Sequence, residues 1–463
     1  MEDSDIYAII ESNLPLNYEK KSQNGEVFTP VSLIEMMYDK FPSSVWSDPR
    51  RKWLDPAAGV GNFALVLFVR LMKGLQRGMP SPTKRAKHII ENMIFMVEID
   101  KENARICRGI FKRLCPDAIP NLHLGDFLTS AAWPTTAFDC IVGNPPYNIG
   151  GKGRAGLKRT HILFTQHSLA CLVDKGYLAF ICPPSYREAG SVMNRLFTSA
   201  VVDEDAATPG HFVFIKIYGA DETFRIFRIK ARVDAFLFQK SAHGNTDIDD
   251  EYGIIHPNIR LNLQRHVPNF GYSIFDKLVK KIEKLGGTTV NAFRSTELSS
   301  LKSSTFGCRG KNKILHLIIE SGRRVFKTGK KHSLANEPKL LVNGLGIPYV
   351  FYDKEGEYGF TQCPMVVLRP SPAVVHFMQS DFFSFLAWGL RLTGNNNLPY
   401  IFDYVPDLGK SDTYKTMDDI RRGLGLTAAE VAFVETHFHR YYFEDVDRAE
   451  SCVAARGTRK KSK

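Results

Sequence analysis

The chain lacks several features that would place it in other classes of protein. None of its eight cysteines forms the C-x-x-C spacing of a zinc ribbon. The first residues, MEDSDIYAII, lack the basic and apolar regions of a secretory signal. The most apolar stretch, residues 63–71, contains Arg70 and is too short to cross a bilayer. These absences predict an intracellular, cytoplasmic protein without a metal site or a membrane anchor.

Positive charge, by contrast, is in excess. Lysine and arginine total 61 against 49 acidic residues, which gives a formal net charge of +12. Basic side chains that replace counterions on phosphates contribute much of the free energy of binding to nucleic acid. The excess therefore indicates a polyanionic partner, although a generally charged surface explains it equally well. With 463 residues, of which 44% are hydrophobic, the chain is long enough for two domains.

Short apolar runs alternate with longer amphipathic segments between residues 52 and 240. Strands are predicted at 52–55, 93–98, 138–142, 176–182, 211–217 and 232–240, and helices at 62–73, 102–114 and 161–173. This alternation predicts a doubly wound α/β domain with a mostly parallel sheet covered on both faces. Residues 73–92, rich in glycine, proline and positive charge, are predicted to form an inserted surface loop.

The composition of the sequence changes after Ser241, where the polar and acidic segment AHGNTDIDDEYG is typical of a linker. We expect a catalytic domain at 1–245, a mixed α+β target-recognition domain at 246–447, and a basic tail at 448–463. A helix is predicted around 372–390, and Thr427 and Glu430 predict a capping box at the start of a late helix.

Asn144-Pro145-Pro146-Tyr147 directly follows the predicted strand at 138–142. In an open α/β sheet, ligands bind outside the carboxyl ends of the strands. Pro145 has a fixed φ angle and also restricts Asn144. The turn can therefore present the Asn144 side-chain oxygen and a neighbouring backbone carbonyl as two acceptors. An ordinary strand-to-loop turn that contains prolines is the alternative.

Two such acceptors can activate an exocyclic amine on an aromatic ring. The lone pair of that amine is delocalised into the ring, which makes it a poor nucleophile. Acceptors that take its hydrogens shift it toward a pyramidal geometry and free the lone pair. Tyr147 supplies a flat face on which the base can stack.

The segment 55–61, DPAAGVG, follows the first predicted strand and precedes a helix. Gly59 and Gly61 would let the backbone approach a ligand closely, and together with Ala64 they also fit a dinucleotide G-x-G-x-x-A pattern. Asp55, placed before the glycines, would repel a pyrophosphate but would suit an ammonium group. This favours a ligand with a cationic end over a dinucleotide.

Three acidic positions follow the next predicted strands. Glu98 can accept hydrogen bonds from both hydroxyls of a ribose, whereas Asp100 is better placed to cap the following helix. Glu98 comes later than the acidic residue of the dinucleotide fingerprint, although the insertion at 73–92 weakens this test. Asp126 can accept from the amino group of an adenine, and the ring of Phe127 can stack on it.

With these motifs in this order, the chain resembles the gamma-class N6-adenine DNA methyltransferases, the group that includes many type II modification enzymes. The resemblance runs from Gly25 to about Lys240. The matching motifs are GEVFTP at 25–30, DPAAGVGNF at 55–63, VEID at 97–100, GDF at 125–127, NPPYNIGG at 144–151, LAFICPPSY at 178–186 and FLFQKS at 236–241. The sequence departs from the family at Ala57, which stands where the first glycine of the loop is usual.

The resemblance implies S-adenosylmethionine as cofactor and methyl transfer to N6 of adenine in double-stranded DNA after base flipping. The cofactor residues that it implies are Phe28, Thr29, Pro30, Asp55, Ala57, Gly59, Gly61, Glu98, Asp126 and Phe127. It implies Asn144, Pro145, Pro146 and Tyr147 as catalytic residues, with Tyr147 and Phe238 on either side of the target base. It also implies a monomer, with any cognate restriction endonuclease acting separately.

Two basic clusters are candidates for contact with DNA phosphates. Lys152, Arg154, Lys158 and Arg159 follow the Asn-Pro-Pro-Tyr turn in a glycine-rich stretch, and Arg323 and Arg324 lie in a cluster at 302–331 with interleaved phenylalanines. For the first cluster, a plain solvated loop is the alternative.

Three other functions use or mimic the same turn. A protein glutamine methyltransferase needs it for an amide, but would carry a helical domain in front and no large domain behind. An RNA base methyltransferase would usually lack so long an extension after the last motif. A non-catalytic DNA-binding subunit would not need Asp55, Glu98 and the intact turn.

Overall fold

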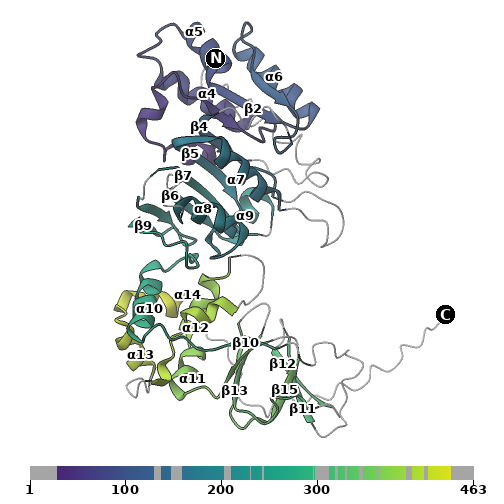
Figure 1. Cartoon of the computed structure of the whole chain (residues 1–463), viewed down its shortest axis with the longest axis vertical. Coiled ribbons are helices and arrows are strands. Elements are labelled where there is room, and N and C mark those ends of the chain that lie inside the picture. The colour runs from purple at the N-terminus through teal and green to yellow at the C-terminus, as the bar shows by residue number, and fades with distance from the viewer. Residues whose placement is uncertain are drawn as a thin grey trace, which may run out of the picture. The chain divides into compact units, whose positions relative to one another are not determined.

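The chain forms two compact units, Met1–Phe270 and Gly271–Lys463 (Figure 1). The computed structural model describes residues 29–129, 137–147, 159–202, 210–229, 231–241, 244–295, 297, 312–318, 322–328, 331–343, 348–361, 364–392, 399–410 and 416–438. Some positions singled out in the sequence lie outside the described residues, namely Phe28, Lys152, Arg154, Lys158 and the predicted tail at 448–463.

A nine-stranded sheet runs through the first unit in the order β3-β2-β1-β4-β5-β7-β6-β8-β9. Its strands are β1 (Trp53–Asp55), β2 (Ile94–Glu98), β3 (Asn121–Leu124), β4 (Phe138–Gly143), β5 (Leu172–Cys182), β6 (His211–Tyr218), β7 (Val233–Gln239), β8 (Thr246–Asp249) and β9 (Ile255–Ile259). The strands β1 to β5 are parallel, and β7 is antiparallel to both β5 and β6. Each strand predicted from the sequence is present.

Helices cover the sheet, as an α/β alternation requires. They are α3 (Val31–Tyr38), α4 (Asn62–Gly74), α5 (Pro82–His88), α6 (Lys101–Leu114), α7 (Thr160–Cys171), α8 (Val192–Val202) and α9 (Ala220–Phe227), with short turns η1 (Ser43–Trp46), η2 (Ile89–Met93) and η3 (Pro184–Arg187). The residues from Phe63 to Val69 in α4 are all buried, which explains why this helix has no polar face in the sequence. On the sheet, α7 packs with α8 over β5 (Figure 1).

Part of the predicted loop at 73–92 is helical. Ser81 caps α5 by accepting from the Lys84 amide, and Pro82 occupies the first helical position. A π-helical turn, η2, then leads directly into β2. The Ser-Pro pair is a helix start signal, and the charge and glycine content of the segment concealed it.

The first unit extends beyond the predicted boundary at 245. Although its sequence is polar, β8 pairs in parallel with β6, and Thr246 is buried. The segment that follows β9 is also tied to the first unit. The Arg187 guanidinium donates to the carbonyls of Val267 and Pro268 at 3.1 Å. The polar and acidic composition was therefore misleading here, because β8 and the edge strand β9 carry polar residues and still belong to the sheet.

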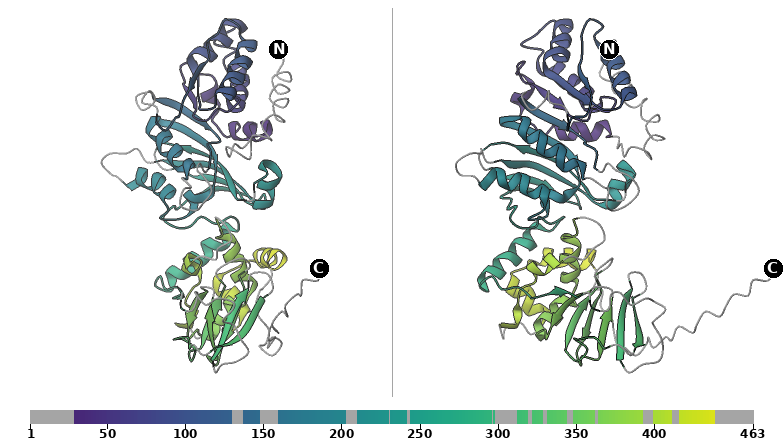
Figure 2. Two further views of the ribbon diagram at one scale, coloured as in Figure 1. Left: turned by 90° about the vertical axis from the view of Figure 1, so that its right-hand side faces the viewer. Right: turned by 45° about the vertical axis from the view of Figure 1, so that its right-hand side comes forward.

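The second unit is a mixed α+β domain, with strands beside helices (Figure 2). One sheet has the order β10-β16-β13-β14 and the other β12-β11-β15. The strands are β10 (Phe293–Arg294), β11 (Asn312–Ile318), β12 (Gly322–Thr328), β13 (Lys339–Val342), β14 (Val350–Asp353), β15 (Tyr358–Thr361) and β16 (Met365–Leu368). The helices are α10 (Tyr272–Lys284), α11 (Pro372–Met378), α12 (Asp381–Gly389), α13 (Met417–Leu424) and α14 (Ala428–His437), with turns η5 (Pro399–Tyr404) and η6 (Leu408–Lys410).

Two sequence signals in this unit can be compared with the structure. The Thr427–Glu430 capping box is present at the start of α14. The helix predicted around 372–390 is instead two helices, α11 and α12, separated at Gln379 and Ser380. In the part of the chain that the structure describes, no helix has the length and apolarity needed to span a membrane, and no cluster of side chains suits a metal ion.

Candidate active site

Three neighbouring parallel strands end at one edge of the first sheet with the predicted site residues. Asp55 is the last residue of β1, Glu98 is the last of β2, and Asn144 directly follows β4. Because β1 lies between β2 and β4, these three residues come from adjacent positions at the carboxyl edge, where an open α/β sheet binds its ligands. We call this the carboxyl edge.

The loop after β1 has the backbone that its glycines predict. Gly59 and Gly61 have φ angles of +56° and +97°, a region that favours glycine. A β carbon at Gly61 would lie 2.7 Å from Cys107 Sγ, whereas one at Gly59 would meet nothing within 4 Å. Gly61 thus allows the loop to pack on α6, while the Gly59 side of the loop is open to a ligand.

Glu98 holds this loop in place. One carboxylate oxygen accepts from the Gly59 amide at 2.7 Å, and the other accepts from the Asp100 amide at 2.8 Å. A carboxylate oxygen can accept more than one hydrogen bond. As predicted, Asp100 caps α6, accepting from the amides of Glu102 and Asn103. The geometry is therefore compatible with a ribose on Glu98, and it adds a structural role that the sequence did not reveal.

The Asp55 carboxyl group is buried beside the turn that carries Asn144. One oxygen accepts from the Ala57 amide at 3.2 Å, and a β carbon at Gly143 would lie 3.0 Å from the same oxygen. Burial raises the pKa of Asp55 to about 8, the Ala57 hydrogen bond opposes this shift, and repulsion from Glu98 adds to it. A cationic ligand beside this buried carboxyl would stabilise its ionised form and lower its pKa.

The Asn144 amide is oriented by a residue far away in the sequence. Its Nδ2 donates to Thr29 Oγ1 at 3.1 Å. Because the amide nitrogen faces Thr29, the oxygen is the end that can accept from an incoming amine. Burial raises the pKa of the Tyr147 hydroxyl well above its usual range, so this phenol stays protonated.

Asp126 and Phe127, which were expected to hold the adenine of the cofactor, agree only partly with that expectation. Asp126 accepts from the Leu128 amide at 2.9 Å. The Phe127 ring is 3% exposed and packs against Phe164 at 5.5 Å between ring centroids, so little of its face is available for stacking. Ile99, which follows Glu98, is 67% exposed. An exposed branched aliphatic residue at this edge is an alternative surface for an adenine, and its position after the acidic residue could have indicated it.

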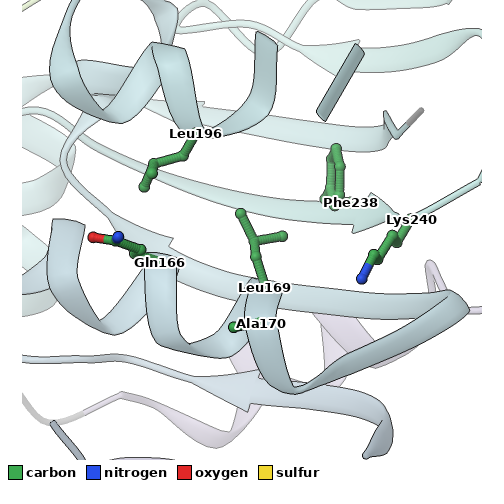
Figure 3. Close-up of a pocket in the computed structure, with 6 residues that line it drawn as sticks. All are labelled: Gln166, Leu169, Ala170, Leu196, Phe238 and Lys240. Carbon is green, nitrogen blue, oxygen red and sulfur yellow. The ribbon is translucent and has the colours of Figure 1, made fainter. Parts of the chain in front are cut away.

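The prediction for Phe238 is wrong. Since β7 is antiparallel, its carboxyl end lies at the opposite edge of the sheet. Phe238 pairs with Leu178, whereas Cys182 at the end of β5 pairs with Asp234. Its ring is 1% exposed, among other aromatic rings. The adjoining pocket of about 270 Å³ is lined by Gln166, Leu169, Ala170, Leu196, Phe238 and Lys240 and contains no residue of the carboxyl edge (Figure 3).

Aromatic residues that the sequence reading missed lie on the correct side. Because β7 is antiparallel to both β5 and β6, β6 runs parallel to β5 and ends at the carboxyl edge. Tyr218 is its last residue, and Phe224, 39% exposed, follows in α9. Counting strand directions along the chain would have favoured these two over Phe238.

Comparison with known proteins fits this geometry. Residues 4–205 match the family model described as N-6 DNA Methylase. That segment contains β1, β2 and the Asn144–Tyr147 turn. Over this segment the chain is similar to the N-6 DNA methylase family. The predicted doubly wound α/β fold is confirmed by the order and directions of the strands.

Three curated relatives of the chain carry related names. An "uncharacterized adenine-specific methylase" of Mycoplasma pneumoniae is 40% identical over 88 residues, 18% of this chain and 21% of the relative. The type II methyltransferase M.VspI of a Vibrio species is 27% identical over 194 residues, 40% and 41% of the two chains. The modification methylase CviBIII of a Chlorella virus is 28% identical over 180 residues, 36% and 40%. The matches thus span less than half of each relative.

The candidate site has features that fit S-adenosylmethionine. The Asn62 side-chain oxygen, at the start of α4, is buried and has no hydrogen-bond partner among the described residues, so it can accept from an incoming donor. Beside it, the Gly59 side of the loop is open, and Asp55 and Glu98 provide acceptors for an ammonium group and for ribose hydroxyls. The donor set therefore matches a cofactor with a cationic end and a ribose.

The candidate DNA contacts are spread over both units. Arg159 is exposed and directly precedes α7. Arg323 and Arg324 are consecutive residues of the edge strand β12, where they pair with Leu317 and His316 of β11. Consecutive positions of a strand belong to opposite faces of a sheet, so these two arginines are separate candidates.

Proposed function

We propose that the chain is a site-specific DNA methyltransferase that transfers the methyl group of S-adenosylmethionine to N6 of adenine in double-stranded DNA. The observation that carries the proposal is the Asn144–Tyr147 turn at the carboxyl edge, with its amide oriented by Thr29 and with Asp55 behind Gly143. This arrangement supports a site in which acceptors for an amine lie beside residues that would bind a cationic cofactor.

In this proposal the cofactor lies across the ends of β1 and β2. Asp55, Ala57 and the loop at Gly59 and Gly61 would surround the methionine end, where the Asp55 carboxylate would pair with the ammonium group. Glu98 would accept from the ribose hydroxyls. Asp126 would accept from the adenine amino group, while Ile99, rather than the buried Phe127, would cover its apolar face. Thr29 and Pro30 would complete the pocket.

When bound, S-adenosylmethionine supplies a methyl group on a sulfonium ion. The Asn144 side-chain oxygen and the Pro145 carbonyl would each accept one hydrogen of the adenine amine. These two bonds withdraw the hydrogens from the plane of the ring and return the lone pair to nitrogen, which forms the new N–C bond as the S–C bond breaks. One N–H hydrogen then leaves as a proton. Tyr147 would stack on the target base.

The target adenine must leave the duplex to reach this turn, at a cost of roughly a few kcal/mol. Basic side chains near the site would offset part of the free energy of base flipping by contacting DNA phosphates. Lys152, Arg154, Lys158 and Arg159 follow the turn, and Arg323 and Arg324 belong to the second unit, which would act as the target-recognition domain. We infer a monomer that works inside the cell, with any restriction endonuclease as a separate protein.

The test is transfer of labelled methyl groups in vitro. The full chain is incubated with methyl-labelled S-adenosylmethionine and, in separate reactions, with mixed-sequence duplex DNA, RNA and a protein mixture. The proposal predicts label in DNA, recovered after digestion as N6-methyladenine. Label in RNA would instead support an RNA base methyltransferase, and label on glutamine would support a protein methyltransferase.

A further inference from the structure

A buried histidine contacts the proposed catalytic turn. His161 lies in the first turn of α7 and is 4% exposed. Its Nδ1 is 3.0 Å from the carbonyl oxygen of Tyr147, and its Nε2 is 3.3 Å from Ser185 Oγ. Its ring meets the Tyr147 ring edge-on, at 6.4 Å between centroids. The imidazole thus bridges the end of the Asn144–Tyr147 turn to the segment after β5.

We propose that His161 is a positioning residue for methyl transfer, fixing the Asn144–Tyr147 turn against the Pro183–Tyr186 segment. This inference rests on the proposed function, because it assigns a role within that reaction.

The turn needs such a contact because two of its residues cannot anchor it. Pro145 and Pro146 have no backbone N–H and donate no hydrogen bond. The Tyr147 carbonyl, in contrast, accepts twice, from the Thr160 amide at 3.1 Å and from His161. Donors at the start of α7 therefore hold the end of the turn.

The tautomer of His161 follows from its partners. A carbonyl oxygen can only accept, so Nδ1 carries the proton that is directed at Tyr147. Nε2 is then an acceptor for the Ser185 hydroxyl. That hydroxyl also lies 3.1 Å from Met193 Sδ, another acceptor, so one proton serves two neighbours. Burial lowers the pKa of His161, which agrees with a neutral ring.

The other end of the bridge is firmly placed. Arg187 lies two residues after Ser185 and forms a fully buried ion pair with Asp234 at 2.7 Å. The Ser185 carbonyl accepts from the Ser191 hydroxyl, and the side chain of Asn194 donates to the Tyr186 carbonyl at 2.8 Å. The turn is therefore tied to a segment that is itself locked to the sheet and to α8.

Replacement of His161 tests the role through kinetics. His161→Leu should lower kcat for DNA methylation by about 30- to 100-fold, because small misplacements of reacting groups have effects of this order. The KM for DNA and the Kd for S-adenosylmethionine should stay within about 3-fold, since the proposed role of His161 requires no contact with either ligand. His161→Asn keeps a side-chain N–H near the position of Nδ1 and should recover most of the rate.

His88→Leu is the matched control, because that ring also bonds a backbone carbonyl, of Pro49 at 2.8 Å, but far from the turn in the fold. Two results would overturn the inference: a Leu variant as fast as wild type, or an Asn variant no better than Leu. If His161→Leu does not fold, Ser185→Ala takes its place. This variant should also lower kcat while leaving the KM for DNA and the Kd for S-adenosylmethionine unchanged.

A spectroscopic readout separates this inference from the proposed function. Nitrogen NMR of the ¹⁵N-histidine-labelled full chain should show His161, identified from the His161→Asn spectrum, as a neutral ring protonated at Nδ1. A ring protonated at Nε2 would contradict the bridge whatever the enzyme methylates. A wild-type chain that never methylates DNA would refute the proposed function but leave this measurement intact.

Discussion

The Nδ2 atom of Asn144 donates a hydrogen bond of 3.1 Å to the hydroxyl of Thr29, a residue 115 positions earlier in the chain. The segment before α3 and the turn after β4 therefore meet at the carboxyl edge. This bond decides which end of the amide can accept from a substrate amine, so a residue expected only to line the cofactor pocket also orients the proposed catalytic amide.

Thr29→Val should separate that orienting role from simple packing. Valine keeps the shape but loses the acceptor, and the loss of one buried hydrogen bond, worth about 1 kcal/mol, predicts a fall in kcat of about 5- to 10-fold. Thr29→Ser keeps the hydroxyl and is the control. Steady-state methyl transfer to DNA measures both variants, and equal rates for them would remove the orienting role.

Asp55 should make the stability of the ligand-free chain depend on pH. Its folded-state pKa is raised to about 8, above the value near 4 expected for an unfolded chain. The protonated group therefore favours the folded state below about pH 4, and this contribution is lost as the pH rises toward 8. Denaturant unfolding of wild type should show a decline of more than about 1 kcal/mol between pH 5 and pH 8 relative to Asp55→Asn. Parallel profiles for the two proteins would contradict this.

Glu98→Gln should weaken binding of S-adenosylmethionine by about 10-fold, the effect of losing roughly 1.4 kcal/mol of charge-assisted hydrogen bonding. Part of the loss comes from the loop, because Glu98 accepts from the Gly59 amide. Titration calorimetry measures it. Glu102→Gln is the control, as that carboxylate forms a surface pair with Arg105. An unchanged affinity in Glu98→Gln would exclude Glu98 from the cofactor site.

Residues that follow local rules could be predicted from the sequence. Asp55 and Glu98 end apolar strands of a regular alternation, and parallel strands necessarily end at the same edge. Asp100 and Thr427 are helix caps with local signatures. In each case the information lies within a few residues of the position.

Long-range relationships could not be predicted in this way. The Thr29–Asn144 bond and the His161 bridge join distant segments, and no spacing indicates them. Phe238 was misplaced because its role depends on strand direction, which motif matching ignores. The boundary at 245 failed because β8 is a polar strand whose partner, β6, lies earlier in the chain.

The two arginines of β12 should contribute separately to DNA binding. Since they occupy opposite faces of the strand, only the one that contacts phosphate should matter. Arg323→Glu and Arg324→Glu are compared with wild type across salt concentrations. One of them should lower the slope of log K against log salt by about 1, and the other serves as its control. If neither variant changes the slope of log K against log salt, the DNA-recognition surface lies elsewhere in the protein.

The central claim is that Asn144 activates the amine of an adenine in DNA. The most direct measurement is sequencing, with detection of modified bases, of DNA from cells that express wild type or Asn144→Ala. The account predicts N6-methyladenine at one recurring sequence with wild type and none with the variant, whose purified form still binds S-adenosylmethionine. The account would be contradicted if adenine methylation persisted in cells that express Asn144→Ala. It would also be contradicted if DNA from cells that express the wild-type protein contained no modified adenine.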